Sequence, residues 1–172
     1  MTDTNQTSPL KVSFDAKRAI EFARSELFER TFKEGMAMVE ETAAYLDGPG
    51  RAASKRLSRA AALAYAGESM RVTTRLMQAA SWLLVQRAVR DGDMDRADAL
   101  HDRYRLGSRE ICLGVCAEET NDLPIQLQDL LARSDNLYRR IARLDDVLFG
   151  TNETPAGARG QMDALAQAFG AK

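Results

Sequence analysis

The chain has few of the residues on which enzyme catalysis and metal binding usually depend. Its 172 residues include one histidine and two cysteines. Acid–base and nucleophilic catalysis commonly use a histidine beside a serine or cysteine, but His101 has no plausible partner of either kind nearby in the sequence. Cys112 and Cys116 lie four residues apart, and no second cysteine pair is present to complete a zinc site. We therefore predict a protein that is not an enzyme and that holds no metal and no cofactor.

An excess of one charge and long hydrophobic runs are also lacking. Lys and Arg number 24 and Asp and Glu number 25, so net charge gives no general attraction to nucleic acid or to an anionic membrane. The longest apolar run, 79–85, is interrupted by Ser81 and is far shorter than the roughly 20 residues of a membrane span. Residues 1–8 are polar, unlike a secretory signal, and the two cysteines fit a reducing compartment. We expect a cytoplasmic protein.

The residues that are abundant favour helix. Hydrophobic residues make up 45% and charged residues 28% of the chain, and only four prolines are present. Alanine, leucine, arginine and glutamate are frequent, and all four have high helix propensity. We predict an all-α fold, an elongated antiparallel three-helix bundle over residues 13–150. A flexible N-terminal lead over residues 1–12 and a flexible C-terminal tail over residues 151–172 flank it.

Capping and turn residues divide this bundle into helices. Ser13 is a plausible N-cap for the first helix, which Gly48-Pro49-Gly50 ends. The second helix is predicted over 52–90, and Asp91-Gly92-Asp93 stops it. A short helix is expected over 95–104, whereas 106–122 contains either a helical turn around 111–116 or extended chain. Leu123-Pro124 opens the third helix, and Gly150 is its expected C-cap.

The stretch 57–89 is apolar on more than one side of a helical wheel. Tyr65, Val72, Leu76 and Leu83 lie on one side, and Leu63, Met70, Met77, Leu84 and Ala88 lie on a second side. A helix on the outside of a small domain needs one apolar stripe. The second stripe predicts a further partner, and symmetric homodimers are the commonest oligomers. We expect a homodimer whose interface includes Tyr65, Met70, Met77, Trp82 and Leu84.

Two further groups suggest contacts with other proteins. Arg71 and Arg75 on the second helix are candidates for partner binding. In the tail, Met162, Leu165, Ala166 and Phe169 have the spacing of a short helix that docks in a groove on a partner. The arginines of the second helix also allow an alternative, a DNA- or nucleoid-associated helical dimer. Their directions on the wheel diverge, whereas a reader of DNA needs its charges on one track.

The same helix carries a family resemblance. Ser69-Met-Arg-Val-Thr-Thr-Arg75 with Trp82, Asp122-Leu-Pro124, and Ser134-Asp-Asn-Leu-Tyr-Arg-Arg-Ile-Ala-Arg-Leu-Asp145 resemble the RcdA family, the alphaproteobacterial regulators of CtrA degradation. The resemblance covers most of residues 14–150.

This resemblance implies a dimeric three-helix bundle without catalytic activity. It implies an adaptor that helps the ClpXP protease degrade cell-cycle regulators, with transcriptional regulators as substrates and the response regulator CpdR as a partner. It also implies a functional C-terminal tail and localisation to a cell pole. No individual binding residue is carried over from the family.

Overall fold

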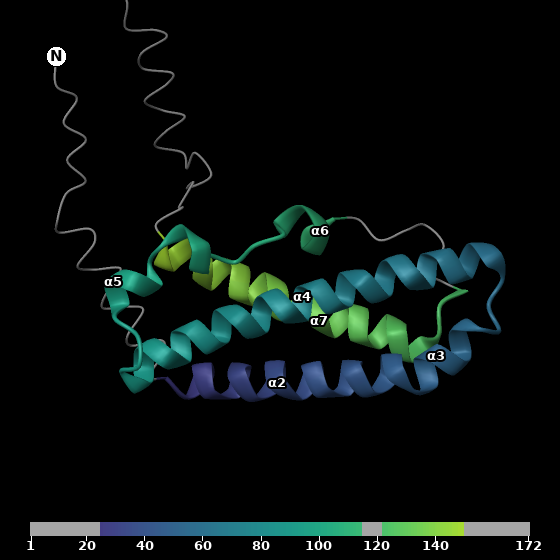
Figure 1. The fold of residues 1–172 in the computed structure, drawn as a ribbon, viewed down its shortest axis with the longest axis horizontal. Helices are drawn as coiled ribbons and strands as arrows, with labels where there is room; N and C mark the ends of the chain where they lie inside the picture. Colours follow the sequence, from purple (N-terminus) through teal and green to yellow (C-terminus); the bar gives the residue numbers. More distant parts are fainter. Residues whose placement is uncertain (1–24, 115–121, 150–172) are drawn as a thin grey trace, which may run out of the picture.

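Three long helices packed side by side form the body of the protein (Figure 1). The computed structural model describes residues 25–114 and 122–149. Within these residues every regular element is helical, and α2 (Glu26–Asp47), α4 (Arg59–Asp91) and α7 (Ile125–Leu148) are the long helices. The chain runs along α2 in the direction opposite to both α4 and α7, so that α4 and α7 are parallel to each other (Figure 1). The predicted all-α bundle is thereby confirmed.

The corner between α2 and α4 differs from the prediction of one helix over 52–90. A short helix, α3 (Pro49–Ser54), opens with proline in its first turn and ends before residue 55. The chain then starts α4 at Arg59, because Ser58 is its N-cap and the Ser58 hydroxyl accepts a hydrogen bond from the Ala61 amide at 3.1 Å. The predicted start of the second helix was therefore wrong, since the serine cap was not recognised.

The end of α4 follows the prediction. Gly92 adopts a left-handed conformation with φ of 84°, and its amide donates to carbonyls of the last turn, as a C-terminal glycine does. The segment expected as one short helix over 95–104 is instead two, α5 (Arg96–Ala99) and the 3-10 helix η1 (Asp102–Tyr104). The helical turn expected near residue 111 is α6 (Arg109–Leu113).

The helix ends expected at Ser13 and Gly150 lie outside the described residues. The first described helix, α2, begins after Ser25, whose hydroxyl accepts a hydrogen bond from the Phe28 amide at 3.2 Å. The expected lead over 1–12 and the expected tail over 151–172 also lie outside them.

The core lies where the three long helices meet. Its largest fully buried apolar side chains come from all three helices: Phe28, Met38, Val72, Trp82, Leu83, Leu127, Leu130, Leu137, Tyr138 and Ile141. Burying each such aliphatic or aromatic side chain stabilises the fold by roughly 1.5–3 kcal/mol. This core fixes the rotation of α4 and therefore decides which of its faces stays open.

Candidate functional site: the open faces of the bundle

One face of α4 remains open and carries a regular apolar stripe. Leu63, Met70, Met77 and Leu84 follow one another at seven-residue steps and are 77%, 72%, 58% and 50% exposed. Residues between them on the same face are small and uncharged: Ala66, Gly67, Thr73, Thr74, Ala80 and Ser81. At 1.5 Å per residue the stripe from Leu63 to Leu84 is about 30 Å long. We call these four large residues and six small residues the α4 stripe.

The structure divides the five predicted interface residues into two groups. Met70, Met77 and Leu84 lie on the α4 stripe, whereas Tyr65 and Trp82 are buried in the core of the same chain. The Trp82 indole donates to Oδ1 of Asp145 on α7 at 2.9 Å. Placing Tyr65 and Trp82 at a dimer interface was therefore wrong, because the three-helix core already encloses both rings.

The two predicted partner-binding arginines point into the protein. Arg75 is buried; its Nε donates to the Cys112 carbonyl at 2.8 Å, its Nη1 donates to the Leu131 carbonyl at 3.2 Å, and its Nη2 lies 3.0 Å from Asp135. Arg71 donates to the Gly114 carbonyl at 2.6 Å. Both side chains hold α6 and the residues next to it, which we call the α6 segment, against α4. The prediction that Arg71 and Arg75 contact a partner protein was therefore wrong.

Asp145, a buried carboxylate that was not predicted as a functional residue, contacts the chain on the N-terminal side of α6 and α6 itself. It is fully buried on α7. Its Oδ1 accepts from Trp82 and from the Leu106 amide at 3.1 Å, and its Oδ2 lies 3.0 Å from Nη2 of Arg109. A charged residue on the inner face of an otherwise apolar helical pattern was the available signal.

The cysteine of this region that the structure describes has the features of a packing residue. Cys112 is buried, and burial raises the pKa of its thiol. A raised pKa disfavours the reactive thiolate at neutral pH. Beside it, the Tyr138 hydroxyl donates to the Gly107 carbonyl at 2.6 Å. Cys112 is therefore explained by packing between α6 and α7, without a redox or metal-binding role for its thiol.

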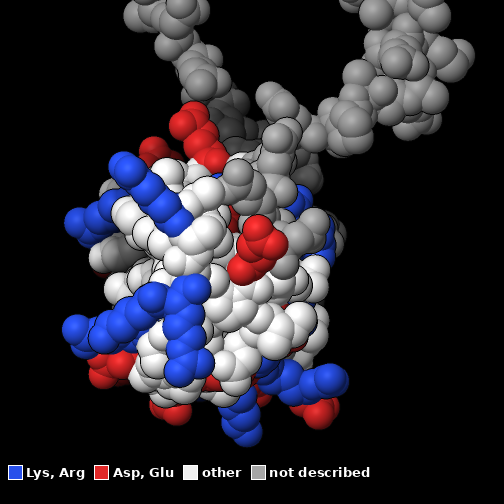
Figure 2. All heavy atoms as spheres, turned by 90° about the vertical axis from the view of Figure 1, so that its right-hand side faces the viewer, with Lys and Arg blue, Asp and Glu red and all other residues white. Residues whose placement is uncertain are grey.

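Four basic side chains gather at the corner between α3 and α4. Arg51, Lys55, Arg56 and Arg59 are all exposed, and among the described residues they form no ion pair. Figure 2 views the bundle from this end and shows Lys and Arg side chains projecting around a largely uncharged surface. We call these four residues the basic corner.

The basic charge does not continue along α4. Arg71 and Arg75 turn inward, as described above. The Arg87 guanidinium stacks over the Phe32 ring at 4.9 Å, and that of Arg90 stacks over Phe28 at 5.5 Å. A DNA-binding helix needs a continuous row of basic side chains along one side. On α4 such side chains gather only at the basic corner.

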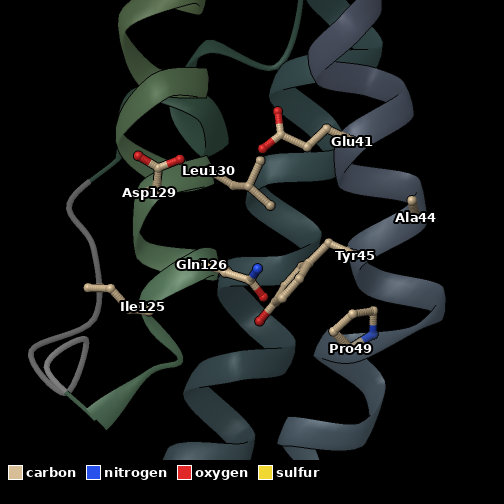
Figure 3. Close-up of a pocket in the computed structure, with 8 residues that line it drawn as sticks. All are labelled: Glu41, Ala44, Tyr45, Pro49, Ile125, Gln126, Asp129 and Leu130. Carbon is tan, nitrogen blue, oxygen red and sulfur yellow. The ribbon is translucent and has the colours of Figure 1, made fainter.

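A second open surface lies between the last turns of α2 and the first turns of α7. A cavity of about 510 Å³ is lined there by Glu41, Ala44, Tyr45, Pro49, Ile125, Gln126, Asp129 and Leu130. Figure 3 shows the Leu130, Gln126 and Tyr45 side chains in the space between the helices, with Glu41 and Asp129 facing each other at one end. We call this cavity the α2–α7 groove.

One arginine joins the two carboxylates of the groove. Arg133 contacts both Glu41 oxygens at 2.8 Å and Asp129 Oδ2 at 3.0 Å. Hydrogen bonds from Arg133 lower the pKa of Glu41, so that carboxyl is ionised at neutral pH. Two carboxylates that share one guanidinium leave a net negative rim.

The remaining predictions concern His101, metal binding, membrane spans and the C-terminal tail. His101 is exposed at the start of η1. Over residues 25–114 and 122–149, no group of three His, Cys, Asp or Glu residues could hold a metal ion. Among the helices of this same region, none is long and apolar enough to cross a membrane. Met162, Leu165 and Phe169 lie outside the described residues.

Comparisons with known proteins identify the family. Residues 19–169 match the family described as "Protein of unknown function (DUF1465)". The crystal structure of RcdA from Caulobacter crescentus CB15 is similar, with 55% sequence identity and a TM-score of 0.62. The alignment covers 76% of this chain and 97% of the Caulobacter chain. A comparison with curated proteins gives no match. The chain belongs to the RcdA family.

Proposed function

We propose that this protein is a non-enzymatic adaptor in regulated proteolysis. It would bring regulatory proteins, transcriptional regulators among them, to the ClpXP protease together with the response regulator CpdR, at the cell pole in the cytoplasm. Membership of the RcdA family supports this role. The physical work of an adaptor is to raise the local concentration of substrate at the unfoldase, since tethering makes the second binding step intramolecular.

The single observation that carries the binding role is the α4 stripe. It exposes four large apolar side chains in a row, without a charged residue among them. Exposed apolar surfaces of this extent mark interaction sites on soluble proteins. We propose that a second copy of the chain covers the stripe, because a seven-residue repeat is the spacing with which two helices pack along one seam.

The spacing supports an antiparallel pair. If Leu63 lies opposite the partner's Leu84, then Met70 lies opposite the partner's Met77, and the arrangement is symmetric. The basic corner then lies near the other end of the partner's α4, where Asp93 and Asp95 are exposed, whereas Asp91 is paired with Arg87 and Arg90 of its own chain. A parallel pair would instead place the two basic corners together, and like charges side by side are unfavourable.

Charge reversal tests this orientation. Reversing Arg56→Glu or Asp93→Arg alone should weaken the dimer about two- to thirtyfold, since an exposed ion pair contributes about 0.2–1 kcal/mol and the pair occurs twice in a symmetric dimer. The double variant should recover affinity in sedimentation equilibrium at low salt. Independent, additive losses in the double variant would contradict the antiparallel orientation.

Reconstituted degradation tests the function itself. Purified ClpX, ClpP, CpdR and a candidate transcriptional regulator are incubated with and without the full chain, and loss of the regulator is followed over time. Faster loss with the chain is expected. Equal rates would count against the adaptor role whatever the oligomeric state. A useful control is Asp146→Ala, which alters a partly exposed carboxylate away from both open faces and should keep full activity.

A further inference from the structure

The α2–α7 groove has the size and lining of a site for a side chain of another molecule. Its volume of about 510 Å³ falls within the range of roughly 300–1,000 Å³ found for ligand pockets. Its walls are mainly apolar, and Ile125 at the start of α7 is 77% exposed. The amide of Gln126 adds a polar group that can hydrogen-bond to a backbone (Figure 3).

Two carboxylates, Glu41 and Asp129, line the otherwise apolar groove, and the sequence around each of them lacks basic residues over a long stretch. No lysine or arginine occurs between Lys33 and Arg51 on the α2 side, where Glu40, Glu41 and Asp47 lie. No lysine or arginine occurs between Arg109 and Arg133 on the α7 side, where Asp129 lines the groove. Arg133 offsets only part of this charge, because it is shared between Glu41 and Asp129. An occupant that carries cations beside an apolar anchor would complement these walls.

The groove is separate from the α4 stripe. The buried side of α4 packs against both α2 and α7 through residues such as Val72, Leu76 and Leu83. The groove opens between α2 and α7, whereas the α4 stripe lies on the outer side of α4. A second copy on the stripe therefore leaves the groove free for another partner.

We propose that the α2–α7 groove binds a segment of a partner protein that places an apolar side chain in the cavity and Lys or Arg side chains beside Glu41 and Asp129. The apolar anchor would contact Ala44, Tyr45 and Leu130. This inference deepens the proposed binding role by naming the chemistry of one partner. The groove is tested by direct binding of a peptide, whereas the adaptor role is tested by the rate of proteolysis. Either test can fail while the other succeeds.

Three synthetic peptides probe the groove. The first is a short fluorescein-labelled helical peptide with two leucines flanked by four lysines. The second replaces the lysines with glutamates, and the third replaces the leucines with serines. We expect saturable binding of the first peptide to the full chain in fluorescence anisotropy, weakened by added salt. The other two should bind about tenfold more weakly or not at all.

Two tryptophan variants on one helix provide a matched pair. Ala44 and Ala43 are neighbouring exposed residues of α2, but only Ala44 lines the groove. Ala44→Trp should fill the cavity and weaken binding of the lysine peptide about tenfold. Ala43→Trp adds the same side chain outside the cavity and should leave the affinity within about twofold. Equal melting temperatures would show that both variants keep the fold.

Several outcomes would overturn the inference. One is equal binding of the lysine and glutamate peptides, and another is an equal loss in the two tryptophan variants. Absence of binding by all three peptides at millimolar concentration would do so as well. A tenfold gain in affinity after removal of residues 151–172 would make the chain's own tail the occupant, against a partner segment.

Discussion

Removing the Asp145 carboxylate should destabilise the protein more than any other change of a single charged group on α7. This carboxylate is fully buried and joins three parts of the chain: Trp82 on α4, Leu106 before α6, and Arg109 on α6. In Asp145→Ala the indole and the Leu106 amide lose their acceptor inside the core. Arg109 is partly exposed and keeps its contact with Asp146 at 2.7 Å, so its guanidinium remains paired.

The magnitude follows from these contacts. A buried donor left without its acceptor costs about 1–3 kcal/mol, so two such donors predict a loss of about 2–6 kcal/mol for Asp145→Ala. Asp145→Asn should cost less, about 1–2 kcal/mol, because the retained Oδ1 is the atom that accepts from both Trp82 and Leu106. A stability of about 5–15 kcal/mol is usual for a domain, so the alanine variant should lose a large share.

Urea unfolding followed by tryptophan fluorescence measures the difference. Trp82 is the single tryptophan, so its signal reports directly on the contact with Asp145. Asp146→Ala serves as the control, and its partly exposed ion pair should contribute less than about 1 kcal/mol. A loss in Asp145→Ala no larger than that of the control would refute the assignment of Asp145 as the buried support of the α6 segment.

Three further predictions concern stability and titration. Gly50→Ala should lower the free energy of unfolding by about 1–3 kcal/mol, because an added Cβ would lie 2.6 Å from the Tyr65 hydroxyl and 2.7 Å from the Tyr45 ring; thermal melting checks this. In the single-chain Met70→Glu/Met77→Glu background, Gly67→Ala should raise stability by about 0.5–1 kcal/mol, since nothing in the same chain lies within 4 Å of the added Cβ; a fall in denaturant unfolding of that variant would contradict this. Burial raises the pKa of Tyr45 to about 12, above the ordinary value near 10. The stability that comes from keeping this hydroxyl neutral should be present below about pH 10 and lost towards pH 12. Phenolate absorbance during a pH titration should show one tyrosine that ionises late.

The apolar stripe of α4 could be predicted from the sequence, because the direction in which a side chain leaves a helix follows from its position along the chain. Leu63, Met70, Met77 and Leu84 were placed on one side of the wheel, and the structure leaves that side open. Trp82 was misplaced because spacing alone does not tell which angles neighbouring helices cover. Its acceptor, Asp145, lies 63 residues away in the sequence.

The inward arginines were unpredictable for a similar reason. Arginine is usually exposed, and Arg75 is buried because the carbonyls of Cys112 and Leu131 and the carboxylate of Asp135 meet its guanidinium. None of these partners is near it in sequence. The α2–α7 groove likewise depends on how α2 and α7 pack, although the long stretches without lysine or arginine around it could have been noticed.

The mass of the protein in solution tests most directly the central claim that the α4 stripe is an interface. Sedimentation of the full chain at micromolar concentration should give twice the mass of a single chain. The double variant Met70→Glu/Met77→Glu should give a single chain with an unchanged helical circular dichroism spectrum, because both residues are exposed in one chain and charge on a buried apolar seam is costly. A wild-type monomer, or a dimer that survives this double substitution, would contradict the account.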